Sequence, residues 1–289
     1  MPAEELIDTL RGAQNRDGGW GYHGGASWAE PTAWALLALV SAGHAEAGVE
    51  RGAAWLWACR RQDGGWSPHP SVRDVTWITA LALLFLAGRA RPADLRPTVQ
   101  WVLAQSGRES GLLTRIRGRL LGSKSEYKES FAGWPWFPGT AAWVAPTAVT
   151  ILALEKWQRS ESSPEVDRRI QEGRGFLLSR MCRDGGWNHG ASRALGYDSD
   201  SYAETTGLAL LALRGLRSGE LERAVDRAEQ HLRQCRSAQA WGWLQLGLLA
   251  RGRAVSQIPA PPAPCRGVLD TAVCLLALAA GQGRHAFWG

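Results

Sequence analysis

Three carboxylates stand directly before runs of apolar residues, at a position that recurs along the chain. Glu30 and Glu204 lie two residues before the threonine that opens such a run, and Asp270 lies one residue before another. If the runs are parallel helices of one ring, their N-termini share one mouth, where free N–H groups and helix dipoles gather. A carboxylic acid shielded from water there is a candidate general acid. The alternative is that each carboxylate only caps its helix.

Between the glutamates we favour Glu204 as the acid. Asp198 and Asp200 lie close to it in sequence, and neighbouring negative charge raises the pKa of a carboxyl group. Glu204, Glu30, Asp270, Asp200 and Asp198 are therefore the candidate catalytic residues.

Aromatic and histidine side chains flank the same helix starts. Aromatic ring faces stabilise cations, and they also bind a sugar or a flat lipid. His23 and His189 occupy two similar histidine–glycine turns, as turn residues or as partners that orient a glutamate. The predicted substrate-binding residues are Trp28, Trp77, Trp143, Tyr202, Trp243, His23 and His189.

The elements that position these residues are internal repeats, which fix the fold. The apolar runs begin at Thr32, Thr79, Thr147, Thr206 and Thr271, with a degenerate copy at Leu244. Because they are apolar nearly all round, they are predicted to be buried helices. They alternate with amphipathic segments at 3–14, 49–60, 95–105, 166–181 and 221–234. This alternation predicts an all-α fold with two concentric layers, an (α/α)₆ toroid of helix-pair repeats; an open superhelix is the alternative.

Glycine-rich turns that end in tryptophan precede several of these helices. Asp17-Gly18-Gly19-Trp20 is repeated at residues 63–66 and 184–187. We interpret Gly133-Trp134 and Gly242-Trp243 as degenerate copies. The tryptophans Trp20, Trp66 and Trp187 are predicted to be structural clamps on helix ends.

Residues 1–289 are predicted to form a single toroid domain. Residues 106–142 interrupt the alternation of helices and are predicted to be an inserted loop or lid. Residues 258–265 are predicted to be a proline-rich connection in place of the sixth outer helix. Residues 112–128 mix basic and apolar side chains, which suits peripheral contact with a membrane surface.

Composition narrows the classes of function. The net charge of +6 comes with no basic stripe or nucleic-acid-binding motif, so no nucleic acid partner is expected. Five cysteines without a C-x-x-C pair indicate neither a disulfide framework nor a thiolate zinc site. With no signal segment or membrane-length apolar run, a cytoplasmic protein is predicted, with or without contact to the inner membrane face. No cofactor and no obligate protein partner are expected.

Gln14-x-x-x-Gly18-x-Trp20 resembles the QW repeat of squalene–hopene cyclases and related class II terpene cyclases. The apolar helices resemble those of the same family and of protein prenyltransferase β subunits. The resemblance implies the toroid and an isoprenoid or other hydrophobic small molecule as substrate. This chain departs from the QW motif in two copies. Gln62 stands directly before Asp63, and Met181 stands where the motif has glutamine. The cyclases enclose substrate between two or more such domains, whereas this chain has one.

The resemblance also suggests where an acid would stand. The cyclases carry Asp-x-Asp-Asp-Thr-Ala, in which the middle aspartate protonates the substrate and a histidine backs it. That aspartate falls on Glu30 and Glu204, and the last aspartate falls on Asp270, but no copy holds the full triplet. The zinc-binding histidine of the prenyltransferases is replaced by Val273. No metal site is therefore expected.

The leading hypothesis is a terpenoid cyclase-like enzyme that protonates an isoprenoid and stabilises carbocations with aromatic rings. Because glutamate is a weaker acid than the activated aspartate of the family, the substrate should protonate easily, as an epoxide or allylic oxygen does. The alternatives are a non-catalytic isoprenoid- or lipid-binding module and a carbohydrate-active toroid.

Overall fold

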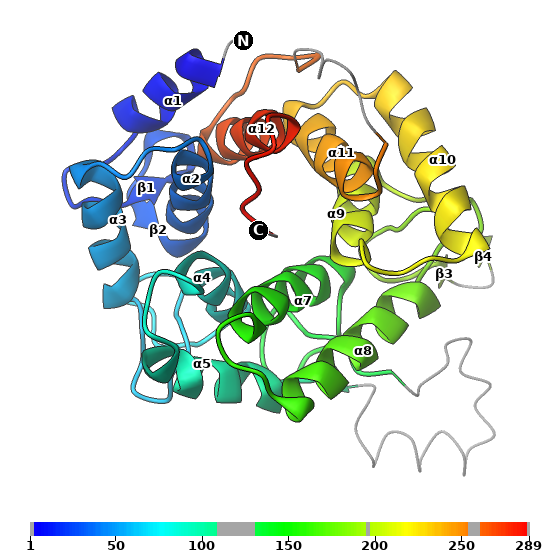
Figure 1. Cartoon of the computed structure of the whole chain (residues 1–289), viewed down its shortest axis with the longest axis horizontal. Helices are drawn as coiled ribbons and strands as arrows, with labels where there is room; N and C mark the ends of the chain where they lie inside the picture. The colour runs from blue at the N-terminus through cyan, green and yellow to red at the C-terminus, as the bar shows by residue number, and fades with distance from the viewer. Residues whose placement is uncertain (1–2, 109–130, 195–196, 254–260, 288–289) are drawn as a thin grey trace.

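The computed structural model describes residues 3–108, 131–194, 197–253 and 261–287, and in these ranges eleven α-helices form two concentric layers (Figure 1). Each inner helix packs against the next, and the last one packs against the first, so the ring is closed. The predicted all-α toroid is confirmed and the open superhelix is wrong. The inner ring consists of α2 (Ala29–Ser41), α4 (Ile78–Leu86), α7 (Val144–Gln158), α9 (Ala203–Ala212), α11 (Ala238–Ala250) and α12 (Val268–Gly281).

The outer helices cover the ring with one apolar side. Ser163 and Ser218 start two of them by accepting hydrogen bonds from the backbone N–H three residues later. The described residues 261–267 precede α12 without forming a helix and run along the outside of the ring in Figure 1. The outer helices are α1 (Ala3–Gly12), α3 (Ala47–Ala58), α5 (Pro92–Ala104), α8 (Pro164–Ser179) and α10 (Gly219–Gln234).

A recurring clasp joins each tryptophan turn to the next inner helix. The backbone N–H of Trp66 donates to Thr79 Oγ1 at 2.9 Å, and its indole N–H donates to the carbonyl of Leu56 near the end of the preceding outer helix, also at 2.9 Å. The equivalent bonds recur at Trp20, Trp134 and Trp187. Trp20, Trp66 and Trp187 are therefore structural clamps as predicted, and Trp134 is a further one.

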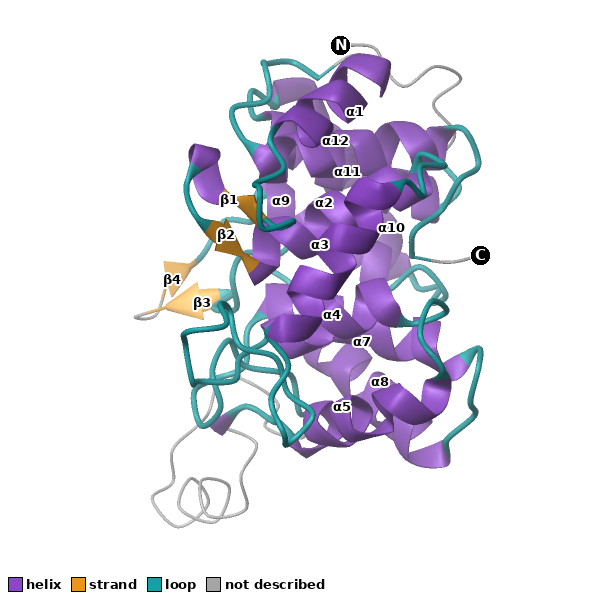
Figure 2. Cartoon of the chain, turned by 90° about the vertical axis from the view of Figure 1, so that its left-hand side faces the viewer, coloured by secondary structure: helices purple, strands orange, loops and turns teal. Residues whose placement is uncertain are grey.

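The ring has two different mouths, on opposite faces of the molecule (Figure 2). One carries two short hairpins, β1 (Trp20–Gly21) with β2 (Ser27–Trp28) and β3 (Arg193–Ala194) with β4 (Tyr197–Asp198). The inner helices begin on this side, so we call it the N-terminal mouth. The chain end after α12 lies on the other side, the C-terminal mouth, where it turns toward the middle of the ring (Figure 1).

Tryptophan side chains fill part of the ring interior. Trp34 on α2 and Trp243 on α11 meet edge to face, with their ring centroids 5.2 Å apart, although α12 lies between the two helices. Both side chains are about 95% buried. The sequence-based interpretation of Gly242-Trp243 as a turn at the mouth is therefore wrong. Ser237 caps α11 through a bond from the N–H of Ala240, so the helix begins well before Trp243.

Two predicted segments lie wholly or partly outside the described residues. The inserted segment 106–142 is described only at its ends, and 112–128 is not described. Of the proline-rich segment 258–265, residues 261–265 are described. Within the described part of the chain, no helix combines the length and apolar character that crossing a bilayer requires.

Candidate functional site at the N-terminal mouth

Glu30 lies in the first turn of α2 and faces a hollow of about 400 Å³ between α2 and α4. The hydroxyl of Tyr22 donates a hydrogen bond to Glu30 Oε2. The loop that carries Tyr22 is held by the β1–β2 hairpin, which pairs Trp20 with Trp28. The walls of the hollow are largely aromatic: Tyr22, Trp28, Pro68, Thr76, Trp77, Ile78 and Phe137 surround Glu30. No other described residue of this lining is acidic.

The electrostatics of Glu30 are set by two opposed effects. Burial raises the pKa of its carboxyl group, while the hydrogen bond from Tyr22 lowers it, and the net shift is upward. Burial likewise raises the pKa of Tyr22, to which the charge and hydrogen bond of Glu30 add. Desolvation therefore outweighs the hydrogen bond from Tyr22 at Glu30. The shift has the direction that a general acid needs, because a raised pKa keeps the carboxyl group protonated to a higher pH.

Glu204 occupies the equivalent place in the first turn of α9, with different neighbours. Burial raises its pKa, the charge of His189 lowers it and the charge of Asp270 raises it. The ring of His189 lies 5.1 Å from that of Tyr202 and 6.3 Å from that of Trp143. Glu204 is not among the residues that line the hollow of Glu30. The charge of His189 therefore acts on Glu204, and its role in orienting that glutamate stays a prediction.

Asp270 and His23 belong to a third part of the mouth. Asp270 Oδ2 accepts a hydrogen bond from the N–H of Arg266 at 3.0 Å, and His23 Nδ1 lies 3.3 Å from the carbonyl oxygen of Arg266. A smaller hollow of about 130 Å³ contacts Tyr22, His23 and Asp270. His23 therefore faces the start of α12. The position beside Glu30, which the sequence suggested for His23, is occupied by Tyr22.

Asp198 and Asp200 are not among the charges that shift the pKa of Glu204, and they have other neighbours. Asp198 lies on the exposed β4 strand, where its carboxylate is 3.1 Å from Arg183 Nη1. Asp200 is exposed and lies near the thiol of Cys182, whose pKa its charge helps to raise. The sequence-based preference for Glu204 depended on these two aspartates, and the structure removes that reason. The negative charge that does act on Glu204 is Asp270.

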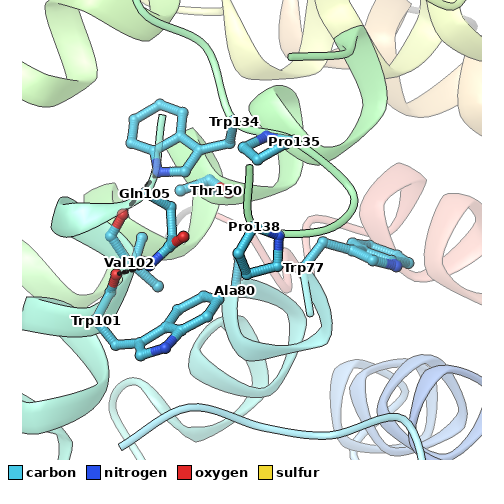
Figure 3. Close-up of a pocket in the computed structure, with 9 residues that line it drawn as sticks. All are labelled: Trp77, Ala80, Trp101, Val102, Gln105, Trp134, Pro135, Pro138 and Thr150. Atoms are coloured by element: carbon cyan, nitrogen blue, oxygen red, sulfur yellow. Dashed lines mark hydrogen bonds between the residues drawn. The ribbon is translucent and has the colours of Figure 1, made fainter. Parts of the chain in front are cut away.

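The aromatic residues divide between the mouth and the interior. Trp28, Trp143 and Tyr202 are each more than a third exposed, and Trp77 lines the hollow of Glu30. Trp243 is the exception, because it is buried inside the ring. Figure 3 shows a second cavity, behind Trp77, whose indole points away from Trp101 and Trp134. That cavity measures about 10 Å³, which is room for about one water molecule and no substrate.

Two functional candidates were missed by the sequence reasoning. Tyr22 is adjacent to His23 in the first turn, and Phe137 lies in the segment predicted as a lid. The available signal for Tyr22 was an aromatic residue in a hairpin just before a helix that carries an acid. Phe137 had no comparable signal, because its loop contacts the preceding repeat, where the N–H of Trp77 donates to the carbonyl of Trp136.

The described residues contain no group of three metal-ligating side chains placed to hold an ion. The five cysteines are free thiols. Cys265 and Cys274 lie close together at α12, and a hydrogen bond between them lowers the pKa of Cys265. The described mouth therefore offers carboxylates, a tyrosine, histidines and aromatic faces as its chemical groups.

The fold is a helical toroid of the kind found in terpene cyclases. The structure resembles ent-copalyl diphosphate synthase from Streptomyces platensis, with a TM-score of 0.54, 18% identity, and coverage of 96% of this chain and 46% of that one. It also resembles a protein from Actinoplanes, with a TM-score of 0.52, 16% identity, and coverage of 87% and 73%. At these identities the likeness concerns the fold.

The sequence itself is similar to part of one terpenoid enzyme. It is 39% identical over 75 residues to a squalene–hopene cyclase of Bradyrhizobium diazoefficiens, covering 22% of this chain and 11% of that protein. No protein-family model matches the chain. The chain thus spans about half of the ent-copalyl diphosphate synthase and about a tenth of the squalene–hopene cyclase.

Proposed function

We propose that the chain is a terpenoid cyclase-like enzyme in which Glu30 protonates an isoprenoid at the N-terminal mouth. The observation that carries this proposal is the half-buried Glu30 carboxyl group, with its raised pKa, in an aromatic hollow of about 400 Å³. The partial similarity to a squalene–hopene cyclase supports the reaction class.

In the proposed reaction each group has one role. Protonated Glu30 gives its proton to an epoxide or allylic oxygen of the substrate, and the hydrogen bond from Tyr22 stabilises the carboxylate that remains. Trp28, Trp77 and Phe137 line the space beside the acid, where their ring faces would stabilise a carbocation by roughly 0.5–2 kcal/mol each.

A non-catalytic isoprenoid-binding module is the second candidate. The contact of Trp34 with Trp243 favours it, because these two buried indoles occupy part of the ring interior in which a long isoprenoid would have to fold in order to cyclise. The carbohydrate alternative is weaker at this hollow. Glycosidases flank the scissile bond with two carboxyl groups, and Glu30 is the one acid among the described lining residues.

The test compares Glu30→Gln with Glu204→Gln as its matched control. Both substitutions keep side-chain size, and both residues occupy the second position of an inner helix. Purified protein is incubated with farnesyl diphosphate, geranylgeranyl diphosphate, squalene and 2,3-oxidosqualene, and products are identified by gas chromatography and mass spectrometry. Turnover should disappear in Glu30→Gln and persist in Glu204→Gln.

The opposite result would transfer the role of acid to Glu204. Saturable binding of one of these compounds without any product would support the binding module instead. Conversion that persists unchanged in both variants would remove both glutamates from the proposal.

A further inference from the structure

The C-terminal mouth of the ring holds a second cavity, separate from the site around Glu30. Its volume is about 480 Å³, and it lies among the C-terminal ends of α2, α4 and α7 and the chain that follows α12. Four of its lining side chains are cations: Arg89, Lys156, Arg159 and Arg284. None of the described residues that line it is acidic.

The positive charge of this cavity exceeds what the helix ends require. Lys156 Nζ donates to the carbonyl of Leu84 at 3.0 Å, and Arg284 Nη1 donates to that of Ala42 at 2.6 Å. Cations commonly occupy helix C-termini in this way, but each such end carries only about half a negative charge. Three helix ends therefore offset roughly one and a half of the four formal charges.

Nearby acids do not remove this excess. Glu50 lies 3.5 Å from Arg89, but its side chain is 69% exposed, so water screens this ion pair. Glu155 is engaged by Arg174 and Arg214 and is not part of the lining. Arg159 donates a hydrogen bond from Nη2 to the carbonyl oxygen of Phe287 at 3.0 Å. This bond uses one N–H group of the guanidinium. The guanidinium is thus held in place while further N–H groups remain available.

The cations are close enough to affect one another. Burial, followed by the charges of Arg159 and Arg89, lowers the pKa of Lys156 to about 8. His285, which also lines the cavity, has its pKa lowered by burial, so it adds no charge at neutral pH. An anion placed among these groups would relieve their mutual repulsion.

We propose that the C-terminal mouth is a binding site for a free, multiply charged phosphate anion of about the size of a diphosphate. Arginine forks match phosphate oxygens bidentately, and the lysine supplies a point charge. Leu37, Val40 and Phe85 form an apolar wall beside the cations, which leaves room for an organic group attached to the phosphate. The site is independent of the proposed reaction at the other mouth.

The test is calorimetric titration of the full chain with inorganic pyrophosphate at low ionic strength. We expect saturable binding of one pyrophosphate per chain that weakens as salt is added. Arg159→Gln and Arg284→Gln should each reduce the affinity roughly tenfold, the loss expected for one charge-assisted hydrogen bond. Arg168→Gln is the control, because Arg168 lies on outer helix α8 and pairs with Glu172; its affinity should not change.

Circular dichroism establishes that the variants are folded. Absence of saturable binding to the wild-type chain, or equal affinity in all three variants, would overturn the proposal. Vesicles of phosphatidic acid distinguish a lipid surface from a free anion. Binding to these vesicles that is lost in the same variants, without any binding of pyrophosphate, would also overturn it.

Discussion

At the scale of single residues, neighbouring side chains distinguish acids that look alike in the sequence. Glu30 and Glu204 share a helix position, and burial raises the pKa of both. Glu30 has a hydroxyl donor and an aromatic hollow, while Glu204 has a charged neighbour in Asp270. Sequence spacing predicted the shared position. It did not predict the partners. Tyr22 reaches Glu30 only through the shape of the hairpin that separates them, and Asp270 reaches Glu204 from another repeat.

Glu30→Gln is expected to stabilise the protein at neutral pH. The pKa of Glu30 is raised in the folded protein, so between the two pKa values the folded protein keeps a proton that the unfolded protein releases. The free energy of unfolding therefore falls as the pH rises from about 4.3, the ordinary glutamate pKa, through the pKa of Glu30 in the folded protein. Glutamine removes this penalty and still accepts a hydrogen bond from Tyr22. The variant should therefore unfold at higher urea concentration than wild type at pH 7, and the difference should vanish below about pH 4.

Glu165→Gln provides the matched control for this pH dependence. Glu165 is an exposed acid in the first turn of outer helix α8, where its charge favours the helix N-terminus by roughly 0.3–1 kcal/mol. Its replacement should lower stability at pH 7, the opposite sign. A Glu30→Gln protein that is less stable than wild type at pH 7 would show that Glu30 is a stabilising cap.

At the scale of elements, the repeat threonines connect the two layers. Thr147 is fully buried and accepts a hydrogen bond from the backbone N–H of Trp134 at 2.8 Å. The indole N–H of Trp134 in turn donates to the carbonyl of Val102 on outer helix α5. The spacing of tryptophan, threonine and paired leucines is local and repeats, so the inner helices were predictable. The start of α11 was not, because Gly242-Trp243 imitates the turn while Ser237 provides the cap.

Thr147→Val tests the clasp in a folded protein. Valine has nearly the same shape but leaves the buried N–H of Trp134 without its acceptor, at a cost of roughly 1–3 kcal/mol. Thr150→Val is the control on the same helix, since Thr150 bonds only to the carbonyl of Pro146 within α7. Urea unfolding should show a clear loss for Thr147→Val and little change for Thr150→Val. Equal losses would mean that the clasp adds nothing beyond burial.

At the scale of the whole molecule, neighbouring inner helices close the ring, and side chains from helices that are not neighbours meet inside it. Close helix packing makes this possible: a side-chain carbon added at Gly207 would lie 2.4 Å from the backbone of Trp243, so α9 and α11 approach closely only with glycine there. The sequence predicted six inner helices but not what would occupy the space between them. That depends on the radius of the ring, which short-range patterns do not encode.

A double-mutant cycle on Trp34 and Trp243 measures this contact across the ring. Replacing a buried tryptophan by alanine costs roughly 3–5 kcal/mol, so leucine, which leaves a smaller cavity, is used at both positions. Edge-to-face aromatic pairs contribute about 0.5–1.5 kcal/mol beyond burial, and the double variant should lose less stability than the sum of the two single variants by about that amount. Trp34 with Trp157, buried on α7, is the control pair and should be additive within about 0.5 kcal/mol.

Because two leucines in place of Trp34 and Trp243 enlarge the ring interior, the double variant should also bind a hydrophobic dye that wild type excludes. Strict additivity for Trp34 and Trp243, with no gain in dye binding, would contradict a ring interior filled by these two indoles.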